Sequence, residues 1–275
     1  IPAPSRLEGV PMDLGLSGKT AVVAGGSRGC GRGISEVLAA EGAAVVFSGR
    51  NPDAVAATEA AIKSGGGKAA GVVADMTTRD GALSIVRAAR ERFGDPDILV
   101  VNSPGAVPDR ATGRWRGFEN SSDDDFEEIY RNFVMSLVYV TRAVLPAMKA
   151  RGWGRLLNIG SVAMKSPHLE DPMPAVNIRV AVNAVMKTLA QEYGPYGITA
   201  NVIATGPFDS ELSRDYRASG TGIKTEEWYR AMLPAGRWGD PIEMGWLAAF
   251  LCSERAAFLT GETIRLDGGY GKSLF

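Results

Sequence analysis

The chain has 275 residues, of which 45% are hydrophobic and 22% charged, and its formal net charge at pH 7 is −1. This composition is typical of a globular protein, and the scattered basic residues argue against nucleic acid or an anionic membrane surface as a partner. The two cysteines, Cys30 and Cys252, lack the spacing of a metal site or a disulfide framework, and no apolar run reaches the roughly 18 residues of a membrane span. We therefore expect a cytoplasmic protein with no membrane segment and no bound metal.

Residues 1–11, IPAPSRLEGVP, precede Met12, and we interpret them as a tag remnant or a disordered tail outside the fold. The first ordered unit is expected in residues 19–50, KTAVVAGGSRGCGRGISEVLAAEGAAVVFSGR. An apolar β-branched stretch, a glycine-rich turn, an amphipathic helix and a second apolar stretch follow one another there. This order predicts one βαβ unit.

The same alternation continues to the end of the chain. Further strands are expected at AAGVVADM, DILVVNS, GRLLNIGS, ITANVIATG and ETIRLDGG, with helices near 83–93, 126–150, after Pro174 and 241–252. Strands that alternate with helices at this spacing predict an α/β fold: residues 12–275 form a single Rossmann-type, doubly wound parallel sheet with helices on both faces. Two insertions, near 104–122 and 210–239, follow carboxyl ends of strands, where open α/β sheets bind ligands.

The glycine-rich turn between the first strand and its helix indicates a dinucleotide site. Gly25, Gly29 and Gly31 allow a tight turn that brings backbone N–H groups against a pyrophosphate at the helix N-terminus. Ser27 belongs to the same turn, and so does Cys30, which we interpret chiefly as a small buried filler. A glycine triplet alone could be only a tight turn, but its place in a βαβ unit favours cofactor binding.

The end of the second strand indicates which nicotinamide cofactor fits. An NAD-selective site has Asp or Glu there to accept the ribose 2′-OH, whereas this chain reads Ser48, Gly49, Arg50. Arg50 and Arg28 could together hold a 2′-phosphate, because guanidinium groups form bidentate hydrogen bonds with phosphate oxygens. We therefore expect NADP(H).

These residues carry a resemblance to the short-chain dehydrogenase/reductase superfamily, and especially to 3-oxoacyl-carrier-protein reductases, from about Leu16 to Gly269. The resemblance implies further site residues: Asp75 and Met76 in ADM beside the adenine, Asn102 in VNSPG, the active-site Asn132 in RNF, the catalytic Ser161 in NIGS, and Gly206 and Ser210 in ATGPFDS beside the nicotinamide. In the last motif Thr205 stands where the family usually has proline.

The chain departs from the family at its proton donor, the tyrosine of Tyr-x-x-x-Lys. Laying RVAVNAV over the usual KAAVNAL puts Arg179 at the lysine and Ala175 at the tyrosine. A shift of the alignment by one residue, to Pro174 or Val176, does not restore a phenol. The resemblance implies that Arg179 holds the cofactor ribose, but a guanidinium does not release its proton near neutral pH.

Other groups therefore have to be considered as the proton source. Ser161 can donate a hydrogen bond to a substrate oxygen, although its own acidity is too weak to supply a proton unaided. Lys165 and His168, which is the single histidine of the chain, lie between Ser161 and Arg179, and an imidazole titrates near roughly 6.5. Both side chains could equally be solvated loop residues, and water held near Asn132 is a further candidate.

Three functions remain open from the sequence. The first is an NADPH-dependent reductase that acts on a small-molecule ketone or conjugated enone and uses an atypical proton relay. Hydride addition to an enone gives an enolate that can be protonated at carbon, so this reaction depends less on the tyrosine. The second is a catalytically silent NADP-binding sensor or scaffold. The third, redox-independent chemistry as in halohydrin dehalogenases, fits poorly, since those enzymes keep the tyrosine and lose the glycine turn. Resemblance to the family also implies a homotetramer or dimer.

Overall fold

The computed structural model of the chain describes residues 12–103, 117–167, 173–218, 227 and 231–274. Seven parallel strands form one sheet with the order β3-β2-β1-β4-β5-β6-β7. The strands are β1 (Thr20–Ala24), β2 (Ala44–Gly49), β3 (Lys68–Val73), β4 (Ile98–Val101), β5 (Gly154–Ser161), β6 (Ile198–Thr205) and β7 (Thr263–Leu266). The order runs outward in both directions from β1 and β4, which confirms the predicted doubly wound sheet.

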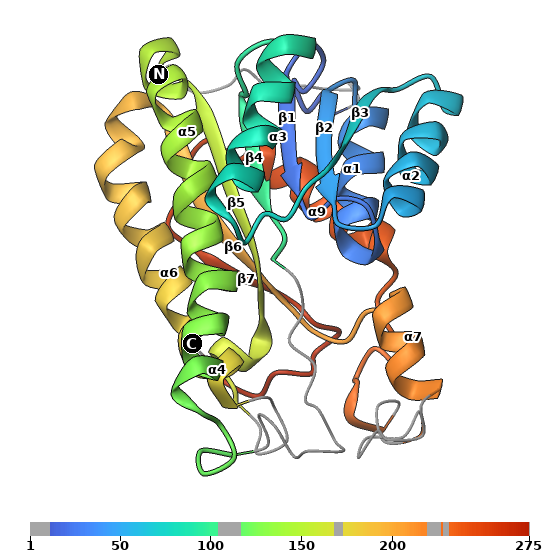
Figure 1. Cartoon of the computed structure of the whole chain (residues 1–275), viewed down its shortest axis with the longest axis vertical. Coiled ribbons are helices and arrows are strands. Elements are labelled where there is room, and N and C mark those ends of the chain that lie inside the picture. Colours follow the sequence, from blue (N-terminus) through green and yellow to red (C-terminus); the bar gives the residue numbers. More distant parts are fainter. Residues whose placement is uncertain (1–11, 104–116, 168–172, 219–226, 228–230, 275) are drawn as a thin grey trace.

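The helices cover both faces of this sheet (Figure 1). They are α1 (Gly29–Ala40), α2 (Pro52–Ser64), α3 (Arg79–Arg92), α4 (Asp123–Tyr130), α5 (Ser136–Arg151), α6 (Met173–Tyr193), α7 (Glu211–Ala218) and α9 (Pro241–Cys252). Short turns complete the list: the π-helix η1 (Arg131–Met135) and the 3-10 helices η2 (Val162–Met164) and η3 (Gly194–Tyr196).

Two apolar clusters separate the layers. On one face, α3, α5 and α6 pack against the sheet through residues such as Ile85, Val140 and Met186. On the other face, α1 and α9 pack against it through residues such as Leu38 and Met244. The strands read as nearly continuous apolar runs because both faces of each strand are buried.

Side chains cap most of the helix starts around the sheet. Asn51 accepts a hydrogen bond from the N–H of Ala54 at the start of α2, and Thr78 does the same for Gly81 at the start of α3. The Thr78 cap explains why α3 begins earlier than the sequence pattern predicted. By contrast, Arg28 precedes α1 without a side-chain cap, so the first N–H groups of α1 are left for another partner.

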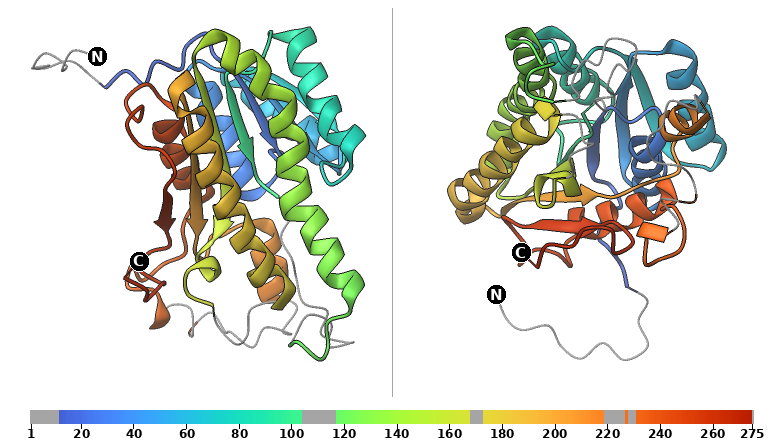
Figure 2. Two further views of the ribbon diagram at one scale, coloured as in Figure 1. Left: turned by 90° about the vertical axis from the view of Figure 1, so that its left-hand side faces the viewer. Right: turned by 90° about the horizontal axis from the view of Figure 1, so that it is seen from below.

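A single long rod runs through α4, η1 and α5 and lies beside α6 (Figure 2). The sequence predicted an uninterrupted helix here, but residues Arg131–Met135 form a π-helical turn that contains Asn132. The hydroxyl of Ser136 donates a 2.6 Å hydrogen bond to the carbonyl oxygen of Asn132 within this turn. Such π-turns often occur at functional sites because they change the direction in which side chains point.

The rod from Asp123 to Arg151 is also long and apolar enough to cross a membrane, with a mean hydropathy of 1.3 in its most apolar window. Half of that window is buried inside the protein, and along the rod Ile129, Leu137 and Met148 belong to the core. Packing inside the α/β domain accounts for the apolar character of the buried half. The cytoplasmic location expected from the sequence stays a prediction.

Candidate active site

The glycine turn after β1 has no room for side chains. Gly25 and Gly29 have φ angles of +80° and +49°, in the left-handed region. A Cβ atom on Gly25 would lie 2.1 Å from the carbonyl oxygen of Asn102, and one on Gly31 would lie 2.0 Å from the carbonyl oxygen of Gly25. The backbone of this turn can therefore approach a ligand closely, as the sequence pattern predicted.

Asn102 ties the end of β4 to this turn. Its side-chain amide donates a 2.9 Å hydrogen bond to the carbonyl oxygen of Gly25, and its own N–H donates to Ala24. Because β1 and β4 are neighbours in the sheet, their carboxyl ends meet at this point. The structure thus brings together two motifs that lie 77 residues apart in the chain.

Three side chains near the turn face inward. Ser27 is buried, and its carbonyl oxygen accepts a hydrogen bond from Thr58 on α2. Met76 lies just beyond β3 with its side chain in the core, so only its backbone is free to face a cofactor. Burial raises the pKa of the Cys30 thiol to about 12, and the carboxylates of Glu211 and Asp240 contribute in the same direction. Cys30 is therefore a neutral packing residue.

The two candidate phosphate-binding cations lie open at the same edge. Arg28 and Arg50 are exposed, and neither guanidinium makes a hydrogen bond or an ion pair with the residues that the structure describes. Asp75, on the adenine side, accepts hydrogen bonds at one carboxylate oxygen from the N–H and the hydroxyl of Thr77. These contacts orient the carboxylate, and its second oxygen makes no hydrogen bond with the residues that the structure describes.

Ser161 is the last residue of β5 and stands directly opposite Thr205 of β6. Its Oγ accepts a hydrogen bond from the N–H of Ala163, which fixes the side chain at the carboxyl edge while its proton stays available for donation. The hydroxyl of Thr205 donates a 2.8 Å hydrogen bond to Gly160 and so binds the two strand ends together. A proline, which the resemblance led us to expect at the position of Thr205, has no hydroxyl and could not make this hydrogen bond.

Arg179 extends from α6 toward η1. Its guanidinium carbon lies 4.1 Å from the ring centroid of Phe133, the residue that follows Asn132. One turn earlier on α6, Ala175 is buried with 2% of its surface exposed, and no phenol stands there. The structure therefore brings Arg179 close to the turn that contains Asn132, and Ala175 offers no side chain that could donate a proton.

Of the two candidate proton donors in the loop after β5, the structure describes Lys165 but not His168. The ammonium of Lys165 donates a 3.1 Å hydrogen bond to the carbonyl oxygen of Thr263. Thr263 pairs with Val202, deeper in the sheet than the pair formed by Ser161 and Thr205, so Lys165 points away from the carboxyl edge. His168 lies outside the described residues.

The segment after β6 closes the far side of the site. A Cβ on Gly206 would lie 2.5 Å from Cα of Asp267, so this position also requires glycine. Ser210 and Ser213 hydrogen bond to each other at the start of α7. The sequence analysis did not single out Glu211, whose carboxylate accepts a 3.0 Å hydrogen bond from the N–H of Gly29. Nothing in the local sequence signals a contact between residues so far apart in the chain.

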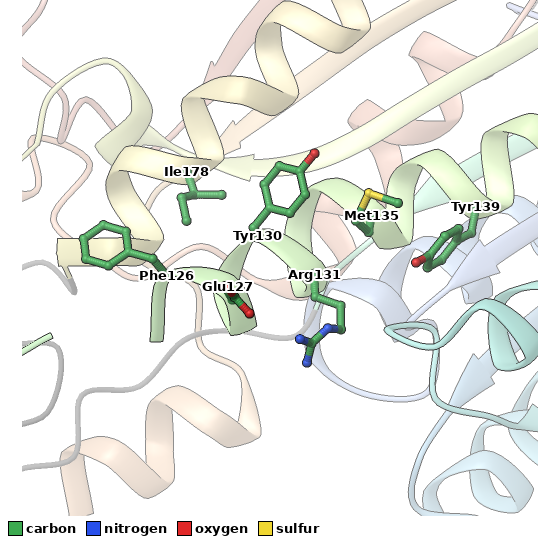
Figure 3. A pocket seen from close by; sticks show the side chains of 7 residues that line it. All are labelled: Phe126, Glu127, Tyr130, Arg131, Met135, Tyr139 and Ile178. Carbon is green, nitrogen blue, oxygen red and sulfur yellow. The ribbon is translucent and has the colours of Figure 1, made fainter. Parts of the chain in front are cut away.

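A separate groove of about 520 Å³ lies on the rod formed by α4, η1 and α5, away from the glycine turn. Figure 3 shows the side chains that line it: Phe126, Glu127, Tyr130, Arg131, Met135, Tyr139 and Ile178. The described residues contain no cluster of three or more histidine, cysteine or carboxylate side chains that could hold a metal ion.

The architecture and these motifs match known proteins over nearly the whole chain. A family model described as enoyl-(acyl carrier protein) reductase matches residues 24–271. The chain is 32% identical to gluconate 5-dehydrogenase of Gluconobacter oxydans 621H, over 94% of this chain and 97% of that protein. It is also 32% identical to the 3-oxoacyl-(acyl-carrier-protein) reductase of Escherichia coli K12, over 93% of this chain and 98% of that protein.

A solved structure agrees with these matches. L-sorbose reductase from Gluconobacter frateurii, complexed with NADPH and L-sorbose, superposes with a TM-score of 0.85 at 29% identity. The superposition covers 96% of this chain and 100% of the sorbose reductase chain. The chain belongs to the short-chain dehydrogenase/reductase family of oxidoreductases.

Proposed function

We propose that this protein is an NADPH-dependent reductase of a small carbonyl compound or a conjugated enone. The observation that carries the proposal is the arrangement at the carboxyl edge of the sheet. The glycine turn there opens onto the uncapped start of α1, with Arg28 and Arg50 beside it and Ser161 on the same edge. A helix N-terminus next to two cations suits the phosphates of NADP(H).

The residues present fit this cofactor. The N–H groups at the start of α1 would bind the pyrophosphate, and Arg28 and Arg50 would bind the 2′-phosphate. Asp75 lies where it could accept a hydrogen bond from the adenine, while Arg179 would hold the ribose beside the nicotinamide. When bound, NADPH would supply a hydride to the carbonyl carbon or to the β-carbon of an enone.

Ser161 has the main chemical role among the side chains of this edge. In the proposed reaction its hydroxyl donates a hydrogen bond to the substrate oxygen, where negative charge develops as the hydride arrives. Arg179 adds positive charge but retains its proton. The proton that completes the reduction, on oxygen for a ketone or on the α-carbon for an enone, must come from another group.

The candidate proton sources differ in how much the structure must rearrange before they can reach the substrate. In this structure Lys165 would first have to leave the carbonyl oxygen of Thr263 before it could act. Water held near Asn132 needs no such rearrangement, and the π-turn there supports this proposal because it redirects the backbone next to the site. His168 remains the second candidate. Enone reduction is favoured by the same absence of a phenol, since carbon protonation does not require an acid on the oxygen.

The relatives support a small-molecule substrate that interconverts between a carbonyl and an alcohol. The compounds in the names of these relatives are gluconate, a 3-oxoacyl chain on a carrier protein and L-sorbose. These compounds differ in size and charge, so they support the reaction type and not one substrate. NADPH is the cofactor in the sorbose reductase complex.

The alternative function is a silent NADP-binding protein, which the buried Ala175 at the tyrosine position favours. One assay separates the two: NADPH oxidation is followed at fixed enzyme concentration with a panel of ketones, keto-sugars, 3-oxoacyl thioesters and enones. The reductase oxidises NADPH with at least one member. A protein that binds NADPH in calorimetry and oxidises none of the panel is the silent binder.

The role of Ser161 is tested with the substrate found in that panel. Ser161→Ala should lower turnover by about 10²-fold or more, the cost of one lost oxyanion donor, with little change in NADPH affinity. Ser166→Ala removes a hydroxyl from the same loop and serves as the matched control. Lys165→Ala and His168→Ala then distinguish the proton donors by loss of one limb of the pH profile. Wild-type turnover in Ser161→Ala, Lys165→Ala and His168→Ala alike would show that the chemistry lies elsewhere.

We also propose that two copies of the chain associate through the rod of α4, η1 and α5 together with α6. Tyr130, which lines the groove of Figure 3, exposes 46% of its surface, and Val180 on α6 exposes 47%. Half of the most apolar window of the rod is not buried within one chain. A second copy of the same helices would cover this apolar surface.

A further inference from the structure

The start of α1 differs from the starts of α2, α3 and α9. Asn51, Thr78 and Asp240 cap α2, α3 and α9 from positions next to the helix they serve. Arg28 gives α1 no such cap. Instead the N–H of Gly29 donates a 3.0 Å hydrogen bond to the carboxylate of Glu211, 182 residues further along the chain.

The surrounding backbone holds Glu211 in this position. Phe208 forms a β-bridge with Gly239, and the hydroxyl of Ser213 donates a 2.7 Å hydrogen bond to the carbonyl oxygen of Phe208. The first residues of α7 also pack on the turn, since Cβ of Ser210 lies 3.0 Å from where a Cβ on Gly29 would be. The carboxylate of Glu211 therefore reaches the turn from an anchored segment.

The chemistry of this contact resembles that of a bound phosphate. A carboxylate is an anion with oxygen acceptors, and a helix N-terminus favours such groups through its free N–H groups and its dipole. Among the described residues Glu211 makes no ion pair that would explain its position. Its carboxylate accepts from the N–H of Gly29, which is the N–H that a pyrophosphate would use.

We propose that Glu211 is an internal competitor for the cofactor: its carboxylate occupies the pyrophosphate position at Gly29 and must leave when NADPH binds. This inference rests on the proposed function, because it assumes that the glycine turn binds a dinucleotide. The competition lowers the apparent affinity for NADPH, since only the fraction of molecules with the carboxylate displaced can bind. It also links cofactor binding to the start of α7, the helix that bears Glu211.

The test measures the dissociation constant of NADPH by calorimetry for the full chain and three variants. Glu211→Asp keeps the charge but shortens the side chain, so that its carboxylate no longer reaches Gly29. Glu211→Gln keeps the length and removes the charge. Asp209→Asn is the matched control. It removes a carboxylate of the same segment, but this carboxylate pairs with Arg214 and not with the glycine turn.

Both Glu211 variants should bind NADPH about tenfold more tightly, which is the scale of one charge-assisted hydrogen bond, whereas Asp209→Asn should bind it as wild type does. Adenosine 2′-monophosphate, which carries no pyrophosphate, should bind equally to all four proteins. Equal NADPH affinity in Glu211→Asp and wild type, or an equal gain in Asp209→Asn, would overturn the competition. If wild type binds neither NADPH nor adenosine 2′-monophosphate, the proposed function itself is wrong.

Discussion

The guanidinium of Arg179 lies over the ring of Phe133, with 4.1 Å between the guanidinium carbon and the ring centroid. Phe133 belongs to the π-turn that contains Asn132, and Arg179 belongs to α6. The planar guanidinium can stack on the ring in a way that a lysine ammonium cannot. The aromatic ring thus orients the guanidinium of Arg179.

This contact should give a measurable coupling energy. In a double-mutant cycle of Arg179→Lys and Phe133→Leu, we expect the two effects on the free energy of unfolding to differ from additivity by about 0.5–1 kcal/mol, the size of a cation–π contact. Phe126→Leu, which alters a ring paired with Phe118, should be additive with Arg179→Lys. Urea unfolding of the single and double variants makes the comparison, and full additivity of the first pair would show that the stacking has no energetic role.

The cofactor choice rests on Arg28 and Arg50. NADPH should bind at least about tenfold more tightly than NADH, the scale of one lost charge-assisted contact. Arg28→Ala and Arg50→Ala should each weaken NADPH binding and leave NADH binding unchanged. Arg32→Ala is the control, because Arg32 already pairs with Glu36 at 2.7 Å. Calorimetry with both cofactors measures these affinities, and equal affinities in wild type would refute the assignment.

The apolar groove on the rod should be covered in solution. Light scattering at micromolar concentration is expected to report a dimer or tetramer. Ile178→Asp, which places a charge in the groove, should shift the protein toward smaller species, while Ala57→Asp on the exposed side of α2 should not. A monomeric wild-type protein contradicts the proposed assembly.

The two thiols should be unreactive in the folded protein. Burial raises the pKa of both Cys30 and Cys252 to about 12, so almost no thiolate is present at pH 8. Titration with a disulfide reagent should label neither residue in the native state and both after denaturation. Rapid labelling of Cys30 in folded protein would show that the glycine turn opens to solvent.

Glu243 should contribute to stability in a pH-dependent way. The hydrogen bond from Arg237, together with the N–H of Asp240, lowers the pKa of Glu243 from 4.5 to about 2. A lowered pKa in the folded state means that the stabilisation is complete above about pH 4.5 and is lost as the pH falls toward 2. The difference in unfolding free energy between wild type and Glu243→Gln should therefore shrink between pH 5 and about pH 3 in urea titrations. A difference that stays constant over this range would exclude the ionised carboxylate as its cause.

Local patterns in the sequence were sufficient for the α/β class, for the strand and helix segments and for the glycine turn. Each of these depends on neighbouring residues: the apolar periodicity of β1, or the left-handed φ of Gly25 and Gly29. The meeting of Gly25 with Asn102 could also be predicted, because both follow parallel strands whose carboxyl ends share one edge.

Tertiary structure alone decided the features that involve distant residues. The π-turn that contains Asn132 interrupts a segment whose sequence pattern predicts one continuous α-helix. This turn packs against α6, which is distant in the sequence. Lys165 finds Thr263, and Glu211 finds Gly29, through contacts between segments 98 and 182 residues apart. No local periodicity encodes such pairs, because they depend on the order of strands in the sheet and on the loops that this order brings side by side. The sequence by itself therefore determined the glycine turn and the strand ends that meet at the sheet edge, whereas the fold decided that Lys165 bonds away from this edge and that Glu211 reaches it.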